Sequence, residues 1–180
     1  MMENNEPIAR QGMTKTALTY GLLVGVLMLV IHLVFYFAGS IASTYMAYIY
    51  YAVMLGGIIL ATKAWRDEVM GGFISYGQAL GFGTLTIFFA SVLVGAYFFI
   101  FYKFVDPGAL NDLLVAAEQK MIEKNPAITD DELDLALGIS QRFMKPGFMA
   151  ISSILNYTFL GFIMSLITSI FMKRNNPEEL

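Results

Sequence analysis

Three long stretches without a charged side chain constrain this sequence more than any other feature. They are residues 16–62, 69–102 and 146–172, which contain 47, 34 and 27 residues without Asp, Glu, Lys or Arg. A membrane-spanning helix needs about 20 predominantly apolar residues, so the first stretch fits two spans and the others fit one each. Charged residues make up only 14% of the chain, against about 25% in soluble domains. The sequence therefore predicts an all-α membrane protein with four transmembrane helices.

The boundaries of these spans are set by the residues between them. The predicted spans cover residues 16–37, 45–62, 76–102 and 147–172. Small residues in 38–44 predict a short turn after the first span. The polar segment 63–68 predicts a connection after the second, and its Trp65 suits the headgroup boundary. The first apolar run is longer than a signal-peptide core, so we expect a retained anchor.

Residues 103–146, between the third and fourth spans, are predicted to form a helical hairpin outside the membrane. Asp106-Pro107 suits a helix start, because Asp caps and Pro fits the first turn. A second start comes at Thr129, whose spacing from Glu132 is that of a capping box. The two apolar stripes are Leu110, Leu113, Leu114, Ala117 and Met121, then Leu133, Ala136, Leu137, Ser140 and Met144. We expect these stripes to pack on each other, on the mouth of the bundle, or on a partner.

The distribution of Lys and Arg predicts the orientation. Four spans put both termini on one side, with six such residues: Arg10, Lys15, Lys63, Arg66, Lys173 and Arg174. The other side has five in a longer segment: Lys103, Lys120, Lys124, Arg142 and Lys145. The positive-inside rule then predicts cytoplasmic tails at 1–15 and 173–180 and an extracytoplasmic hairpin at 103–146.

A family resemblance begins at the polar connection and extends toward the C-terminus. Residues 66–68 read Arg-Asp-Glu, and residues 71–79 read Gly-Gly-Phe-Ile-Ser-Tyr-Gly-Gln-Ala. An Asp-Pro pair comes after the third span, an acidic hairpin comes next, and residues 143–148 (Phe-Met-Lys-Pro-Gly-Phe) open the last span. Over essentially the whole chain this pattern resembles the bacterial domain-of-unknown-function 4199 family. The resemblance implies a small four-span inner-membrane protein, and it implies no activity.

Small residues at four-residue spacing recur in three of the spans. The pairs are Gly21 with Gly25, Gly77 with Gly81, and Gly161 with Ser165. Such pairs let helix backbones approach closely within a membrane. They predict packing inside the four-helix bundle, which is the commoner use, or alternatively a dimer interface.

His32 is the only ionisable group that the sequence places well inside a span. It lies five residues before the end of the first span, and Tyr97 lies five before the end of the third. Asn156 lies about nine residues into the fourth span. A neutral His offers one donor and one acceptor, so we predict an intramembrane polar cluster in which His32 reaches Tyr97 or Asn156. Intramembrane ionisable residues are functional candidates, but the lack of an accompanying carboxylate favours a structural role.

The chain has one His, no Cys and no carboxylate within a span. We therefore expect that the protein is not an enzyme and that it has no cofactor and no metal site. The lack of a large basic block argues against a nucleic-acid partner. The expected partners are the lipid bilayer and, through 103–146, a second copy or another membrane protein. The expected role is a scaffold or interaction component. The alternative is a small transporter or channel for a neutral or lipid-like solute, lined by polar side chains of the third span: Gln78, Thr84, Thr86 and Ser91.

Overall fold

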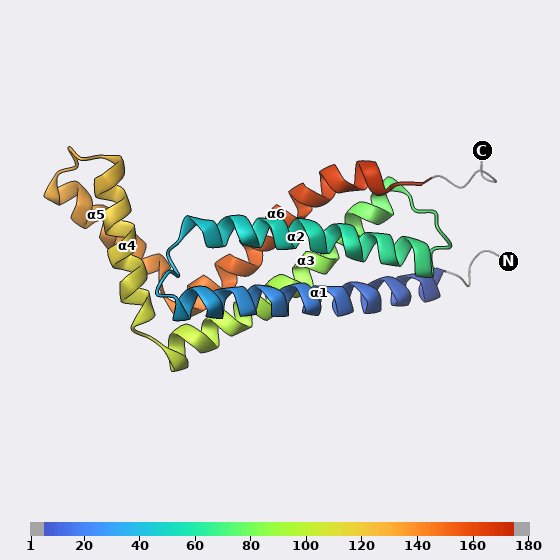
Figure 1. The fold of residues 1–180 in the computed structure, drawn as a ribbon, viewed down its shortest axis with the longest axis horizontal. Coiled ribbons are helices and arrows are strands. Elements are labelled where there is room, and N and C mark those ends of the chain that lie inside the picture. The colour runs from blue at the N-terminus through green and yellow to red at the C-terminus, as the bar shows by residue number, and fades with distance from the viewer. Residues whose placement is uncertain (1–5, 175–180) are drawn as a thin grey trace.

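Four long helices form a bundle in the computed structural model, which describes residues 6–174 and, in that range, side chains from residue 12 onward (Figure 1). They are α1 (Glu6–Phe37), α2 (Thr44–Ala64), α3 (Tyr76–Ile100) and α6 (Pro146–Met172). Each belongs to a stretch long and apolar enough to cross a membrane: Gly12–Phe37, Thr44–Val69, Tyr76–Val105 and Pro146–Met172. Two shorter helices, α4 (Ala109–Lys124) and α5 (Asp130–Phe143), lie outside these stretches. The predicted all-α membrane fold is confirmed.

The ends of α2 and α3 differ from the predicted span ends. Each helix continues through one π-helical turn, at Trp65–Val69 after α2 and at Phe101–Val105 after α3. The segment 63–68, predicted to be a polar connection, is therefore helical. Trp65 is only 2% exposed, and its indole stacks on Phe82 with ring centroids 4.6 Å apart. Trp65 therefore packs inside the bundle near the end of the second span, because the continuing helix turns the indole inward.

The predicted N-terminal tail is also partly helical. α1 begins at Glu6, ten residues before the predicted start of the span. Residues 1–5 and 175–180 of the two predicted tails lie outside the described part of the chain.

The core of the bundle surrounds α3, which packs along both α1 and α6. Several side chains from three helices are completely or almost completely buried: Met28, Met54, Ile58, Ile87 and Val94. Large apolar side chains point outward on every long helix, for example Leu23, Leu60, Ile100 and Phe159. In water such a surface would be a liability, and in a bilayer it faces lipid.

Small residues determine how closely the neighbours approach α3. A methyl group on Gly21 would lie 2.6 Å from the backbone oxygen of Thr86, and one on Gly25 would lie 2.9 Å from the side chain of Leu93. On the other side of α3, a methyl group on Gly161 would lie 2.6 Å from Cβ of Ile87. These three glycines therefore hold α1 and α6 against α3 at distances that a larger side chain would prevent.

The remaining small residues differ in their surroundings. The side chain of Ser165 fills the space beside Gly83 of α3, within the bundle. Gly77 has no neighbour within 4 Å of its missing methyl group, and Gly81 has only the end of Met13 at 3.6 Å. Gly77 and Gly81 instead line an open apolar groove of about 480 Å³ on the outer surface of α3 and α6.

The turn between α2 and α3 is joined to the end of α6. Gly71 and Gly72 have φ values of 67° and 92°, which glycine adopts without steric cost. Ile74 and Arg174 then exchange two backbone hydrogen bonds, of 3.0 and 2.9 Å. The side chain of Ser75 caps α3 in a reciprocal capping box with Gln78. Residues 71–79, which carry the family resemblance, thus form the turn before α3 and the first residues of that helix.

The α4–α5 hairpin lies at the opposite end of the bundle, with α4 running across the bundle axis (Figure 1). Asp106 Oδ1 accepts a hydrogen bond from the backbone N–H of Ala109 at 3.1 Å, so it caps the first turn, although α4 begins at Ala109 and not at the predicted Pro107. Thr129 and Glu132 form the predicted capping box of α5. Every residue of the two predicted stripes is half-buried, but α5 contains no fully buried residue.

Candidate functional site: a buried histidine beneath a polar cleft

His32 lies inside the bundle and uses both of its ring nitrogens. It is 1% exposed. Its Nδ1 lies 2.9 Å from the hydroxyl of Tyr97, and its Nε2 lies 3.1 Å from the hydroxyl of Tyr102. A neutral imidazole has one donor and one acceptor, so one tyrosine accepts from the ring and the other donates to it. The histidine is therefore fully satisfied without a charged partner.

The rings around His32 come from one face of α3 and the π-helical turn at its end. The imidazole centroid lies 5.1 to 6.0 Å from the rings of Tyr97, Phe98, Phe101 and Tyr102, and three of the four contacts are edge-to-face. Edge-to-face packing is a favoured geometry of aromatic pairs. The cluster therefore fastens the second half of α1 to the last turns of α3.

Asn156 does not join this cluster. The structure brings His32 and Tyr97 together, but Asn156 is exposed and lines a shallow depression beside Ser152 and Ser153. Its place is taken by Tyr102, which the sequence had put at the outer boundary of the span. No local pattern in the sequence marks this contact, because Tyr97 belongs to α3 and Tyr102 to the π-helical turn that follows it.

A second polar contact lies one turn further along α1, toward the hairpin. The hydroxyl of Tyr36 donates a hydrogen bond of 2.7 Å to Asp106 Oδ2. The other carboxylate oxygen of Asp106 caps α4 through Ala109. Asp106 thus connects the end of α1, the end of α3 and the start of α4 through one side chain. Phe101 packs edge-to-face on both Tyr36 and His32, so the two polar contacts share one aromatic wall.

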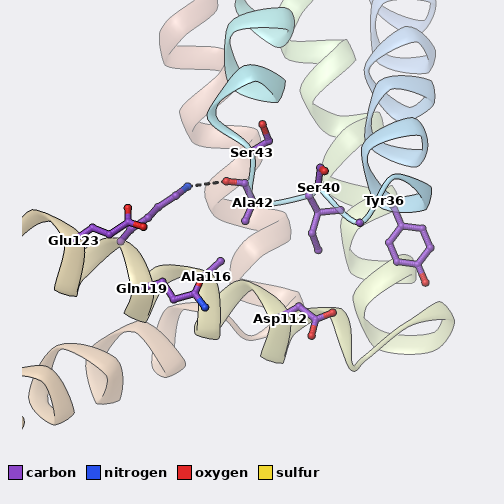
Figure 2. Close-up of a pocket in the computed structure, with 11 residues that line it drawn as sticks. Tyr36, Ser40, Ala42, Ser43, Asp112, Ala116, Gln119 and Glu123 are labelled. Atoms are coloured by element: carbon purple, nitrogen blue, oxygen red, sulfur yellow. Dashed lines mark hydrogen bonds between the residues drawn. The ribbon is translucent and has the colours of Figure 1, made fainter.

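Beyond Tyr36 the turn between α1 and α2 and one face of α4 enclose a cleft of about 460 Å³ (Figure 2). Its lining residues are Tyr36, Gly39, Ser40, Ile41, Ala42, Ser43, Asp112, Ala116, Gln119, Lys120 and Glu123. The Lys120 ammonium donates a 2.7 Å hydrogen bond across the cleft to the backbone oxygen of Ala42. Asp112 lies at the Tyr36 end of α4 and Glu123 at the other end (Figure 2).

The buried histidine and the polar cleft have different chemical surroundings. In the described part of the chain, no group of three His, Asp or Glu side chains is placed to hold a metal ion. His32 bonds to tyrosine hydroxyls and lies among aromatic rings, whereas the cleft offers hydroxyl, amide, carboxylate and ammonium groups to solvent. The buried histidine is suited to holding the helices together, and the cleft is suited to holding a ligand.

Comparisons with known proteins give a family but no activity. Neither a curated protein nor a solved structure matches the chain. The family model described as "Protein of unknown function (DUF4199)" matches residues 19–174, a range that contains the His32 cluster, the 71–79 turn and the whole hairpin. The chain therefore belongs to the DUF4199 family, as its central signature indicated.

Proposed function

We propose that this multi-pass membrane protein is a non-enzymatic interaction component that contacts a protein partner through the α4–α5 hairpin. One observation carries the proposal: an exposed apolar stripe on α5. Leu135 is 68% exposed, Ile139 48% and Phe143 52%. Because these residues are four apart, they lie on one face of the helix. An exposed apolar face outside the spans is typical of a surface that another protein covers.

Other apolar residues of the hairpin are half-buried where its two helices meet. The half-buried stripe of α5, which includes Leu133 and Leu137, is accompanied by a half-buried stripe on α4, and α4 and α5 contact each other. Val115 and Ile122 on α4 remain exposed in addition to the α5 stripe. Two helices that pack on each other and still expose apolar side chains have a further surface available for a partner.

The proposed location is the inner membrane, with the hairpin extracytoplasmic. The start of α1 and the ends of α2 and α6 lie at one end of the bundle (Figure 1). This end has Lys15, Lys63, Arg66, Lys173 and Arg174, and the positive-inside rule favours the cytoplasm for it. A single Cys at Asp131 should then react with an impermeant thiol reagent in intact cells, and one at Glu68 only after lysis. The reverse pattern would invert the orientation.

The polar side chains of α3 give the transport alternative little support. The hydroxyls of Thr84 and Thr86 donate to carbonyls one turn earlier in α3. Ser91 donates to Phe88 and also contacts Thr158 of α6, and Gln78 caps its own helix. Groups that are satisfied in this way do not offer a solute a hydrogen-bonded path.

Photo-crosslinking tests the proposed interaction. A photoreactive residue at Ile139, in the full chain within native membranes, should give a discrete adduct, whereas the same residue at Asp131 should give little. Two differently tagged copies in one cell distinguish a second copy from another membrane protein. Equal adducts at both positions, or none at Ile139, would contradict the proposal, as would solute flux through the purified protein in liposomes.

A further inference from the structure

The cleft between the α1–α2 turn and α4 lies apart from the exposed stripe of α5 and points to a second activity. We propose that this cleft binds a linear organic amine that carries more than one positive charge. The inference is independent of the proposed protein contact, because it rests on the groups that line the cleft and on its elongated shape.

The shape comes from one face of α4. Asp112, Ala116, Gln119 and Glu123 line the cleft, and their spacing of three or four residues puts them on one side of the helix. The first and last are eleven residues apart, which corresponds to roughly 16 Å at the rise of an α-helix. The site is therefore a groove along three helical turns that suits an extended chain.

The charges in the groove are set by side chains. The C-terminal end of α1 and the N-terminal end of α2 both approach it, and their opposite dipole ends offset each other. Asp112 and Glu123 are both exposed, and neither forms an ion pair within the described residues, where the one such pair joins Arg66 and Asp67. The groove thus has a carboxylate at each end without a cation bound to it.

An ammonium group already lies in the groove, since Lys120 is on the helical turn next to Glu123. Lys120 Nζ donates to the backbone oxygen of Ala42 at 2.7 Å. The amide of Gln119 also lines the groove, and its oxygen can accept from a second amine, whereas the hydroxyls of Ser40 and Ser43 point away from α4 (Figure 2). The wall formed by the α1–α2 turn is therefore able to bind protonated amines, and a ligand with separated amines could also reach a carboxylate at either end.

The test is the binding of spermidine to the purified full-length protein in lipid nanodiscs at fixed ionic strength. We expect saturable binding that Asp112→Asn and Glu123→Gln each weaken by about three- to fivefold, and the double variant by about tenfold, as for exposed charge pairs. Lys120→Gln should tighten binding, because it removes a competing cation and frees the carbonyl of Ala42. Glu118→Gln is the matched control, since Glu118 is on α4 but does not line the cleft, and it should change nothing.

Each other outcome overturns the inference. Loss of affinity with Glu118→Gln equal to that of Asp112→Asn would mean diffuse attraction to an acidic hairpin. Displacement of spermidine by Mg²⁺ at equal ionic strength would mean the same. Weaker spermidine binding by the Lys120→Gln variant would mean that the amine does not compete with Lys120 for the carbonyl of Ala42. Saturable binding of citrate that depends on Lys120 would mean that the groove takes an anion. These readouts do not involve Ile139 crosslinking, so failure here leaves the proposed interaction surface standing.

Discussion

In the bundle, side chains such as Met54 and Val94 are fully buried, whereas α5 of the hairpin contains no buried residue at all. The bundle is held by close approach of helices at small residues, and the hairpin by end caps and half-buried stripes. Packing of the first kind tolerates few changes, and structure of the second kind opens locally at low cost. The proposed partner surface and the proposed amine cleft are thus located where the chain is easiest to rearrange.

The largest effect is expected from a side chain added where α6 meets α3. Gly161→Leu would place atoms within 2.6 Å of Cβ of Ile87, and we expect it to lower the free energy of unfolding by about 3 kcal/mol or more. Gly77→Leu is the matched control, because the position of its Cβ is open. Unfolding of both variants in mixed micelles measures the difference. Equal stability of the two would mean that the α3–α6 contact is looser than described.

Removal of the buried imidazole should have the next largest effect. His32→Phe leaves the hydroxyls of Tyr97 and Tyr102 without their shared partner, and we expect a loss of about 2–3 kcal/mol. Adding Tyr102→Phe should recover part of this loss, since it removes the orphaned hydroxyl. The coupling is measured by unfolding the two single variants and the double variant. Strictly additive losses would show that the hydrogen bond contributes nothing.

The hairpin offers the contrasting case of a change that stays local. Thr129→Ala removes the side chain that accepts from the backbone of Glu132, and loss of such a cap costs about 1 kcal/mol. We expect faster amide hydrogen exchange throughout α5 and unchanged exchange in α3. Faster exchange in both helices would mean that the hairpin and the bundle unfold as one unit.

The smallest effect is a pH dependence confined to the start of α5. Hydrogen bonds from the backbone N–H and the hydroxyl of Thr129 hold the pKa of Glu132 below its ordinary value of 4.5. Because the folded pKa is depressed, the stabilisation is complete above the unfolded pKa and is lost as pH falls through the folded one. The protection of α5 amides, measured against the intrinsic exchange rate at each pH, should therefore decrease as the pH falls below 4.5. Glu132→Gln should remove this pH dependence, and an unchanged profile in that variant would contradict it.

Much of the fold could be predicted because charge gaps and end caps are local signals. The four spans arise from long apolar segments, which are more stable in lipid than in water. The caps at Thr129 and Asp106 arise from side chains that accept hydrogen bonds from nearby backbone N–H groups. The inward position of Trp65 in the π-helical continuation could not be predicted in this way, because the indole stacks on Phe82 of another helix. Local propensity does not specify such a contact.

The polar cluster was half predictable for a related reason. Depth along a span is obtained by counting residues, and it correctly placed Tyr97 beside His32. Rotation about the helix axis depends on which face packs inward. At about 100° per residue, Asn156 lies on the side of α6 opposite Gly161 and Ser165, the small residues that face α3. Gly161 and Ser165 could be recognised in the sequence as small residues. The position of their face on α6 would have excluded Asn156 from the His32 cluster.

The hydrogen bonds between Ile74 and Arg174 have a consequence for the order of events during synthesis. The turn at 71–75 emerges early, but its backbone partner exists only after the whole of α6 has been made. The same holds for Arg66, whose guanidinium reaches the carbonyl of Met172, 106 positions later. Until then, this end of α2 and α3 lacks its backbone partner, and the Arg66 guanidinium lacks its contact with α6. The contacts of Ile74 and Arg66 with the end of α6 therefore form late in membrane insertion. A chain whose synthesis stopped within α6 would lack both contacts.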